Sequence, residues 1–311
     1  MRPISRNWFP SAAFAGSIAL LMLTALPGVT AGGTVTADDE YRREVDEWYQ
    51  SRIERLKSPD GYLTLAGLFP LANGENRFGS AEDNNLVFPH DVPAHAGVFT
   101  SNDGGVRIDV AEGVTITAAD EAVRSMQLKT DADQRPTVLA LGSFRFYAIE
   151  RAGKLYVRLK DRQSELRQNF EGIERFPVDV AWRIEGRFKP YDPPKTLRIP
   201  NVLGYEVEES CPGAVEFDVG GEMFYLEPVP AAGGRLFIVF GDETSGLETY
   251  GGGRFLVADA PSEDGIVVLD FNKAYNPPCA FTQYATCPLP HQANRLPVRI
   301  EAGEKKWGER H

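Results

Sequence analysis

The 311-residue sequence has few of the residues that build most metal and redox sites, with only three cysteines and four histidines. A zinc site needs three or four Cys, His or acidic side chains to converge, and no C-x-x-C or H-E-x-x-H motif is present. Asp242, Glu243 and Glu248 could offer oxygens to calcium, but their spacing is not that of an EF-hand and favours a solvated acidic loop. We therefore expect no metal and no cofactor.

Recognisable catalytic motifs are also missing. There is no G-x-S-x-G elbow. The glycine-rich segment YGGGRF, residues 250–255, lacks the Gly-Lys-Ser/Thr sequence and the following helix of a phosphate-binding loop, and is typical of a tight turn. A Ser-His-Asp triad through His95 or His291 is open, although no spacing indicates it. The sequence leaves enzymatic activity undecided.

Long apolar runs are confined to the N-terminus. The run SAAFAGSIALLMLTAL, residues 11–26, follows Arg2 and Arg6 and precedes the segment VTA, which ends at Ala31. This order predicts a secretory signal peptide over residues 1–31, and an uncleaved N-terminal anchor is the alternative. We expect an exported protein, periplasmic or extracellular, that has no membrane contact after cleavage.

Positive charge is in short supply, with 33 Lys and Arg against 44 Asp and Glu. The predicted signal peptide carries two arginines and no acidic residue, so the mature chain has 31 positive and 44 negative side chains and a net charge of −13. Such a field repels nucleic acid and anionic lipid, and we expect neither as a partner.

The three cysteines allow one disulfide. Export places them in an oxidising compartment, and Cys279 and Cys287 are close in sequence, so we predict a bridge between these two. Cys211 is then expected to be a lone buried thiol.

Hydrophobic periodicity predicts one helix followed by strands. Apolar residues recur at helical spacing over residues 38–57, where Asp38 and Asp39 can cap the helix and SPDG ends it. After this the pattern changes to short strands, with two-residue turns at Gly220-Gly221 and Ala152-Gly153. The predicted fold class is mainly β, with an N-terminal helix and two β-rich units at residues 60–160 and 161–307.

The first β-rich unit resembles the forkhead-associated β-sandwich. In that family a Gly-Arg turn is followed by Asn and two apolar residues, then by Ser-x-x-His and paired strands. Gly79, the run Asn85-Leu86-Val87 and His95 match this pattern. Ser80 stands where the family has its phosphate-binding arginine, Val92 replaces the serine, and Arg77 is two residues out of register. Because the arginine fork binds the phosphate, we expect a scaffold and no phosphopeptide ligand.

A more specific resemblance covers nearly the whole mature chain. The segments FPVDVAWRIEGRFKPYDPPKTLRIPNVLG, GDETSGLETYGGGRFLVAD and LDFNKAYNPPCAFTQYATCPLPHQANRLPVRIEAGEK resemble the bacterial family catalogued as domain of unknown function 1684, from about Tyr41 to Lys305. The resemblance implies kinship and carries no activity. The strand pattern, and not the resemblance, predicts an antiparallel sandwich or barrel for the second β-rich unit.

Polar side chains follow several predicted strands in the last third of the chain and form the candidate site. The candidate ligand-binding residues are Asp242, Thr249, Tyr250, Arg254, Asp270, Asn272, Tyr275, Asn276 and Asn294. In the first interpretation they are structural, as turns, backbone caps and a buried ion pair. In the second, Arg254 binds a small polar ligand in a pocket while the amides and tyrosines surround it. In the third, Asp242 or Asp270 works with Arg254 in a hydrolase acting on a glycan or ester.

Overall fold

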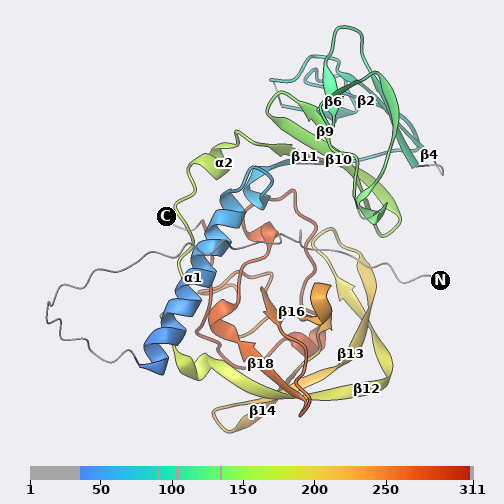
Figure 1. The fold of residues 1–311 in the computed structure, drawn as a ribbon. Coiled ribbons are helices and arrows are strands. Elements are labelled where there is room, and N and C mark those ends of the chain that lie inside the picture. The colour runs from blue at the N-terminus through green and yellow to red at the C-terminus, as the bar shows by residue number, and fades with distance from the viewer. Residues whose placement is uncertain (1–35, 90, 103–104, 134, 309–311) are drawn as a thin grey trace, which may run out of the picture.

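The computed structural model describes residues 36–308 except 90, 103–104 and 134, so the predicted signal peptide lies outside the described residues. The described chain is mainly β, with one long helix and several antiparallel sheets. Figure 1 shows the sheets in two groups, a green group at the top and a yellow-to-red group below. No helix of the described residues is long and apolar enough to span a membrane.

The long helix α1 (Ala37–Lys57) begins with a capping box. Its N-cap is Thr36, whose hydroxyl accepts from the Asp39 amide, and the Asp39 carboxylate accepts from the Thr36 amide in return. Asp38 and Asp39 were expected as caps. Asp39 is one, as the N3 residue of the capping box, and both residues lie in the first turn, where negative charge stabilises the positive end of the helix dipole. Ser58 ends the helix, as the SPDG segment predicts.

The first β-rich unit is a sandwich of two sheets. The six-stranded sheet has the order β1 (Leu65–Pro70), β11 (Lys154–Asp161), β10 (Phe144–Arg151), β9 (Leu139–Leu141), β6 (Ile116–Ala118) and β7 (Glu121–Val123). The five-stranded sheet has the order β3 (Leu86–Val87), β2 (Gly74–Gly79), β4 (Gly97–Asn102), β5 (Gly105–Val110) and β8 (Ser125–Leu128). A short 3₁₀ turn, η1 (Tyr62–Thr64), leads into β1, and η2 (Asp131–Asp133) follows β8.

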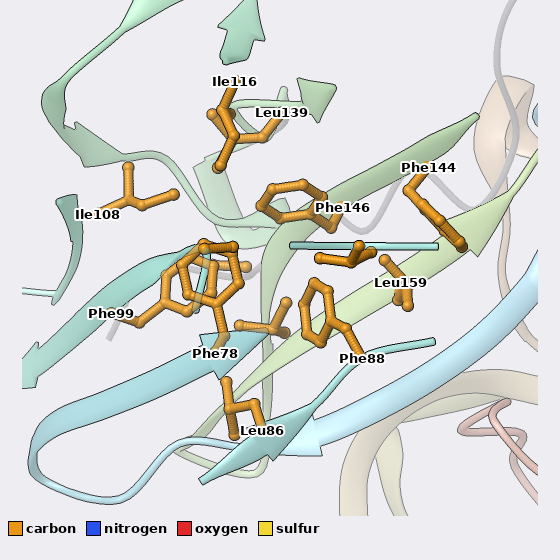
Figure 2. Packing of buried hydrophobic residues seen from close by; sticks show 14 of the residues in the cluster. Phe78, Leu86, Phe88, Phe99, Ile108, Ile116, Leu139, Phe144, Phe146 and Leu159 are labelled. Carbon is orange, nitrogen blue, oxygen red and sulfur yellow. The ribbon is translucent and has the colours of Figure 1, made fainter. Parts of the chain in front are cut away.

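A phenylalanine-rich core joins the two sheets of this sandwich (Figure 2). Phe78 contacts the rings of Phe88, Phe99 and Phe146 at centroid distances between 4.6 and 6.0 Å. Aromatic burial of this kind is the main stabilising term of a β-sandwich core. The resemblance to the forkhead-associated sandwich is compatible with this architecture and stays a prediction.

The second β-rich unit contains a four-stranded and a three-stranded antiparallel sheet. The four-stranded sheet has the order β14 (Glu222–Leu226), β13 (Glu206–Val219), β12 (Arg183–Pro200) and β18 (Ile266–Asp270), and the three-stranded sheet β15 (Val229–Pro230), β16 (Leu236–Phe240) and β17 (Arg254–Ala258). Short helical turns connect them: α2 (Glu165–Gln168), η3 (Val180–Trp182), η4 (Ala232–Gly234), η5 (Phe271–Lys273), η6 (Pro278–Ala280) and η7 (Gln292–Asn294). A second core around Phe217, Phe240 and Phe271 fills the space between these sheets.

Both predicted two-residue turns are confirmed. Gly220 and Gly221 have φ of 65° and 88° and join β13 to β14, and Ala152 and Gly153 have φ of 50° and 74° and join β10 to β11. Two consecutive left-handed residues are the signature of the hairpin turn that matches the twist of a strand pair. The second turn sets the register of β10 against β11.

Helix α1 packs against the second β-rich unit, as Figure 1 shows. Leu56 shares an apolar cluster with Phe170, Ile173 and Phe281. The Arg52 side chain forms a buried ion pair with Glu304, and its Nη2 donates to the Asn276 carbonyl at 2.9 Å. The helix therefore belongs to the C-terminal core, although the first sandwich follows it in sequence.

Candidate functional site

The predicted cluster is centred on Arg254 and is closed to solvent. Arg254 begins β17 opposite Phe240 of β16, and its side chain is 0% exposed. Its Nη2 donates to Asp242 Oδ1 at 3.1 Å and to the Ile300 carbonyl at 2.9 Å, and its Nη1 donates to the Ala302 carbonyl. The Nε atom has no hydrogen-bond partner, and the guanidinium lies over the Phe240 ring at 5.2 Å.

Asp242 is equally enclosed. Its Oδ2 accepts from the Thr244 hydroxyl at 2.8 Å and from the Ile300 amide at 2.9 Å. The Thr244 and Thr249 hydroxyls share a hydrogen bond of 2.9 Å. Arg254, Asp242 and Thr249 therefore form a continuous network that holds the loop after β16 against residues 300–302.

The three predicted amides bind backbone. Asn294 exchanges hydrogen bonds with the amide and carbonyl of Glu227 at 2.8 and 3.0 Å. Asn272 does the same with Asp179 at 3.1 and 2.8 Å, and Asn276 donates to the Lys305 carbonyl at 2.7 Å. All three are at most 4% exposed, so they serve as backbone caps.

Asp270 lies in a different cluster from Arg254. Its Oδ1 accepts from the Tyr41 hydroxyl of α1 at 2.6 Å, and its Oδ2 pairs with Lys273 at 3.1 Å. Burial and the Asp270 carboxylate both raise the pKa of Tyr41, so this phenol stays a neutral donor. The cluster ties helix α1 to the end of β18.

The two tyrosines are also engaged by neighbours. The Tyr250 hydroxyl donates to the Cys279 carbonyl at 3.3 Å, and the Arg52 guanidinium lies over the Tyr275 ring at 4.5 Å. None of the nine predicted residues lines either cavity of the described chain reported below. The contacts support the structural interpretation, while ligand binding and hydrolysis at these residues stay predictions without a supporting contact.

The predicted disulfide is present. Cys279 and Cys287 are bonded and close a segment eight residues apart in sequence, and Cys211 is a free buried thiol. The Cys279 amide also donates to Cys287 Sγ at 3.2 Å. The segment between the two cysteines is therefore a rigid wall, and it faces the first sandwich.

A cavity of about 610 Å³ lies where the disulfide segment meets the outer face of the β10–β11 hairpin. Pro278, Ala285, Thr286 and Cys287 line it from the disulfide segment, and residues 206–208 of β13 line it from the side. Its other lining residues are Asp60, Tyr62, Leu65, Asp131, Ala132, Pro136, Val138, Arg145, Tyr147, Glu150, Arg151, Ala152, Gly153, Arg158 and Lys160. A smaller cavity of about 440 Å³ lies beside Tyr49 and Trp307.

The floor of the larger cavity is cationic because of strand register. Arg145 lies directly opposite Lys160, and Tyr147 lies opposite Arg158. Like charges at opposed positions of an antiparallel pair are destabilising. The register therefore places two positive charges on the same face of the hairpin, at the cavity floor.

Arg158 is the most enclosed cation of the floor, at 8% exposed. Its Nη2 donates to the Thr286 hydroxyl at 3.1 Å, and its buried Nε has no hydrogen-bond partner. Within the described chain no carboxylate forms an ion pair with it. Its neighbour Arg151 also reaches Thr286, at 3.2 Å, but is neutralised by Asp131 at 2.5 Å.

Tyr62 stands beside this guanidinium at the entrance to β1. Desolvation raises the pKa of Tyr62, and the positive charges of Arg158 and Arg151 oppose the rise. The phenol therefore stays protonated at neutral pH and can donate a hydrogen bond into the cavity. Thr286, Tyr62 and Arg158 are three donors brought together from three separate parts of the chain.

This site was not among the residues predicted from the sequence, although the sequence contains a signal for it. In SFRFYAIERAGKLYVRL, alternation assigns Arg145 and Tyr147 to the face opposite Phe144 and Phe146. The Ala152-Gly153 turn then fixes the partners across the hairpin. The alternation and the turn position together predict that Arg145 and Lys160 lie opposite each other. The position of the disulfide segment above them depends on tertiary packing and is not predicted.

Comparisons with known proteins give a family and no activity. Residues 168–305 match the family described as "Protein of unknown function (DUF1684)". The resemblance was expected from Tyr41 onward, and the match covers only the C-terminal unit. The solution NMR structure of an uncharacterised protein from Haloarcula marismortui is 31% identical, with 47% of this chain and 82% of that chain covered and a TM-score of 0.39. No curated protein matches this chain.

Proposed function

The chain belongs to the DUF1684 family of unknown function, and from that premise we propose that it is an exported binding protein for a small anionic ligand, held in the cavity above the β10–β11 hairpin. The ligand carries a carboxylate or a phosphate. The proposal moves the expected polar-ligand pocket from the C-terminal unit to its junction with the first sandwich.

The observation that carries the proposal is the unpaired Arg158 guanidinium. An ionised group that is 8% exposed loses most of its hydration and is stabilised only by hydrogen bonds or an opposite charge. Arg158 has the Thr286 hydroxyl as its partner and an unused Nε. A carboxylate or phosphate oxygen on the cavity side of the guanidinium would supply the opposite charge through a charge-assisted hydrogen bond, the strongest kind available to Arg.

The surroundings of Arg158 support the same ligand chemistry. Arg145 and Lys160 add positive charge on the floor, and their known hydrogen bonds go to backbone carbonyls, which leaves their charge uncompensated. A cavity of about 610 Å³ is within the range of small-molecule sites. The positive charge is confined to the hairpin floor, because the cavity lining as a whole has four cationic and five acidic side chains.

Export rests on the N-terminal sequence and on the disulfide. The apolar run of residues 11–26 with its basic flank is the pattern of a signal peptide. The Cys279–Cys287 bond forms one wall of the cavity and is stable in an oxidising compartment. We therefore place the proposed binding activity in the periplasm or outside the cell.

Thermal unfolding with added anions tests the binding proposal. Succinate, citrate and inorganic phosphate are compared with neutral glycerol and glucose for wild type, Arg158→Gln and Arg107→Gln. Arg107 lies on β5 of the other sheet and serves as the charge-matched control. We expect at least one anion to raise the Tm of wild type and Arg107→Gln and to leave Arg158→Gln unchanged. Equal shifts in all three proteins, or no shift with any anion, would overturn the proposal.

A further inference from the structure

The charge of the residues that line the cavity differs between the two ends of the β10–β11 hairpin. At the far end from the hairpin turn, Arg145 and Lys160 oppose each other. Near the turn, the residue that precedes β13 contacts the hairpin, because the Tyr205 hydroxyl lies 3.5 Å from the Tyr156 hydroxyl and the Lys154 ammonium lies 6.0 Å from the Tyr205 ring centre. The residues that follow Tyr205 therefore enter the cavity at its turn end.

Two of those residues carry carboxylates that form few or no ion pairs. Glu206 and Glu208 both line the cavity, on either side of Val207. Glu208 has only a long contact of 3.7 Å with Arg198, in which both side chains are about 70% exposed. Glu206 forms no ion pair with any described residue. By contrast, Asp131 is paired with Arg151, and Asp60 with Arg162.

The two ends are separated by a distance that suits a short peptide. Tyr156 marks the turn end and Lys160 the far end, four residues along β11. At about 3.4 Å per residue the separation is roughly 13 Å. An extended chain of three or four residues spans that length between its amino and carboxyl groups, since each residue adds at most about 3.5 Å.

We propose, on the basis of the anion-binding function above, that the ligand is a peptide of three or four residues with both termini free. Its carboxylate binds at the far end, between Arg158 and the Arg145–Lys160 pair, and its ammonium group meets Glu206 and Glu208 at the turn end. Leu65, Val138 and Tyr147 also line the cavity and provide apolar surface for the side chains. A simple dianion would leave the acidic end unused.

Calorimetric titration with three forms of one peptide tests this ligand class. The probes are trialanine, N-acetyl-trialanine and trialanine amide, which remove the ammonium or the carboxylate one at a time. We expect the amide to bind wild-type protein at least tenfold more weakly than trialanine, and the N-acetyl form about fivefold more weakly. In Glu206→Gln/Glu208→Gln the penalty for acetylation should vanish while the penalty for amidation persists.

The controls separate failure of the peptide class from failure of the binding site. Glu112→Gln/Glu121→Gln removes the same charge from exposed positions of the first sandwich and should keep both penalties. If N-acetyl-trialanine binds as tightly as trialanine while anions still bind through Arg158, the peptide class is wrong and the anion site stands. If trialanine amide binds as tightly as trialanine and Arg158→Gln has no effect on any probe, both proposals fail.

Discussion

Two buried arginines of this protein have opposite environments. Arg254 is 0% exposed and is neutralised by Asp242 with two backbone carbonyls beside it. Arg158 is 8% exposed, has one hydroxyl partner and forms no ion pair with the described residues. Both have a buried Nε without a hydrogen-bond partner, so the difference between them is the carboxylate that Arg254 has and Arg158 lacks.

The difference shows how a buried charged side chain that stabilises the fold can be distinguished from one that is available to a ligand. A buried ion pair whose remaining hydrogen bonds go to backbone resists disruption because removing one partner leaves the other charge unsolvated. A buried cation on a cavity wall that lacks a carboxylate partner within the chain is suited to an anion from outside it. An unpartnered Nε alone does not make this distinction, because both arginines have one.

The largest expected effect follows from breaking the Arg254 network. Arg254→Met should lower the free energy of unfolding by about 3–5 kcal/mol, because Asp242 is left as an uncompensated buried charge. Urea denaturation followed by circular dichroism measures the change. The double variant Asp242→Asn/Arg254→Met should lose less than the single variant. A loss below about 1 kcal/mol for Arg254→Met would contradict the structural role.

Removing the disulfide tests the wall that faces Arg158. Cys279→Ser/Cys287→Ser should lower the free energy of unfolding by about 2.5 kcal/mol, since the unfolded chain gains the entropy of a short open loop. It should also weaken anion binding, because Thr286 is no longer held beside the guanidinium. Cys211→Ser is the comparison that keeps the bridge. Unchanged anion affinity in the bridge-free protein would show that this wall is dispensable.

Replacing Arg158 should have little effect on the stability of the fold and a large effect on anion binding. Arg158→Met is expected to change the free energy of unfolding by no more than about 1 kcal/mol, since the lost hydrogen bond to Thr286 is offset by removing a poorly solvated charge. The anion-dependent rise in Tm should disappear. A destabilisation comparable to that of Arg254→Met would erase the distinction between the two arginines.

The smallest effect concerns Glu227, whose environment is intermediate between the two. Its Oε1 accepts from Tyr191 and Lys195, whereas its buried Oε2 has no hydrogen-bond partner and lies 3.8 Å from His291 Nδ1. Burial lowers the pKa of His291, with Lys195 adding to the fall and Glu227 opposing it. The folded state therefore takes up a proton less readily than the unfolded chain, and stability should fall as the pH drops through about 6.5.

Denaturation curves between pH 7.5 and pH 5.5 measure this dependence. His291→Gln should flatten it, whereas His95→Gln should not, because the His95 side chain is 61% exposed. A wild-type stability that rises on acidification over this range would mean that Glu227 outweighs burial at His291.

Much of the fold could be predicted from local sequence. Helical periodicity identified α1, two left-handed turn pairs identified both hairpins, and the short Cys279–Cys287 spacing identified the disulfide. These features depend on residues near one another in the chain, where propensity and turn chemistry decide. The polar cluster around Arg254 was also recognised as a group, and its interpretation as caps and a buried ion pair agrees with its contacts.

The cavity could not be predicted because its walls come from distant segments. Arg158 and Thr286 are 128 residues apart, and no local pattern brings them together. The helix start was recognised from Asp38 and Asp39, of which Asp39 takes part in the capping box, whereas the N-cap itself is Thr36. Pairing between far segments depends on the packing of whole sheets, which hydrophobic periodicity does not encode.

The position of helix α1 makes the first sandwich an inserted domain. The helix packs on the C-terminal unit, and the chain leaves it at Lys57 and returns beside the same point. The Arg167 Nε donates to the Lys57 carbonyl at 2.6 Å, and the Ser164 hydroxyl donates to the Leu63 carbonyl at 2.6 Å. Entry and exit of the insertion are therefore neighbours, and at the entry Leu63 and Leu65 also pack into apolar clusters with residues of the C-terminal unit. A cut at residue 161 would separate the C-terminal unit from the helix that completes its core.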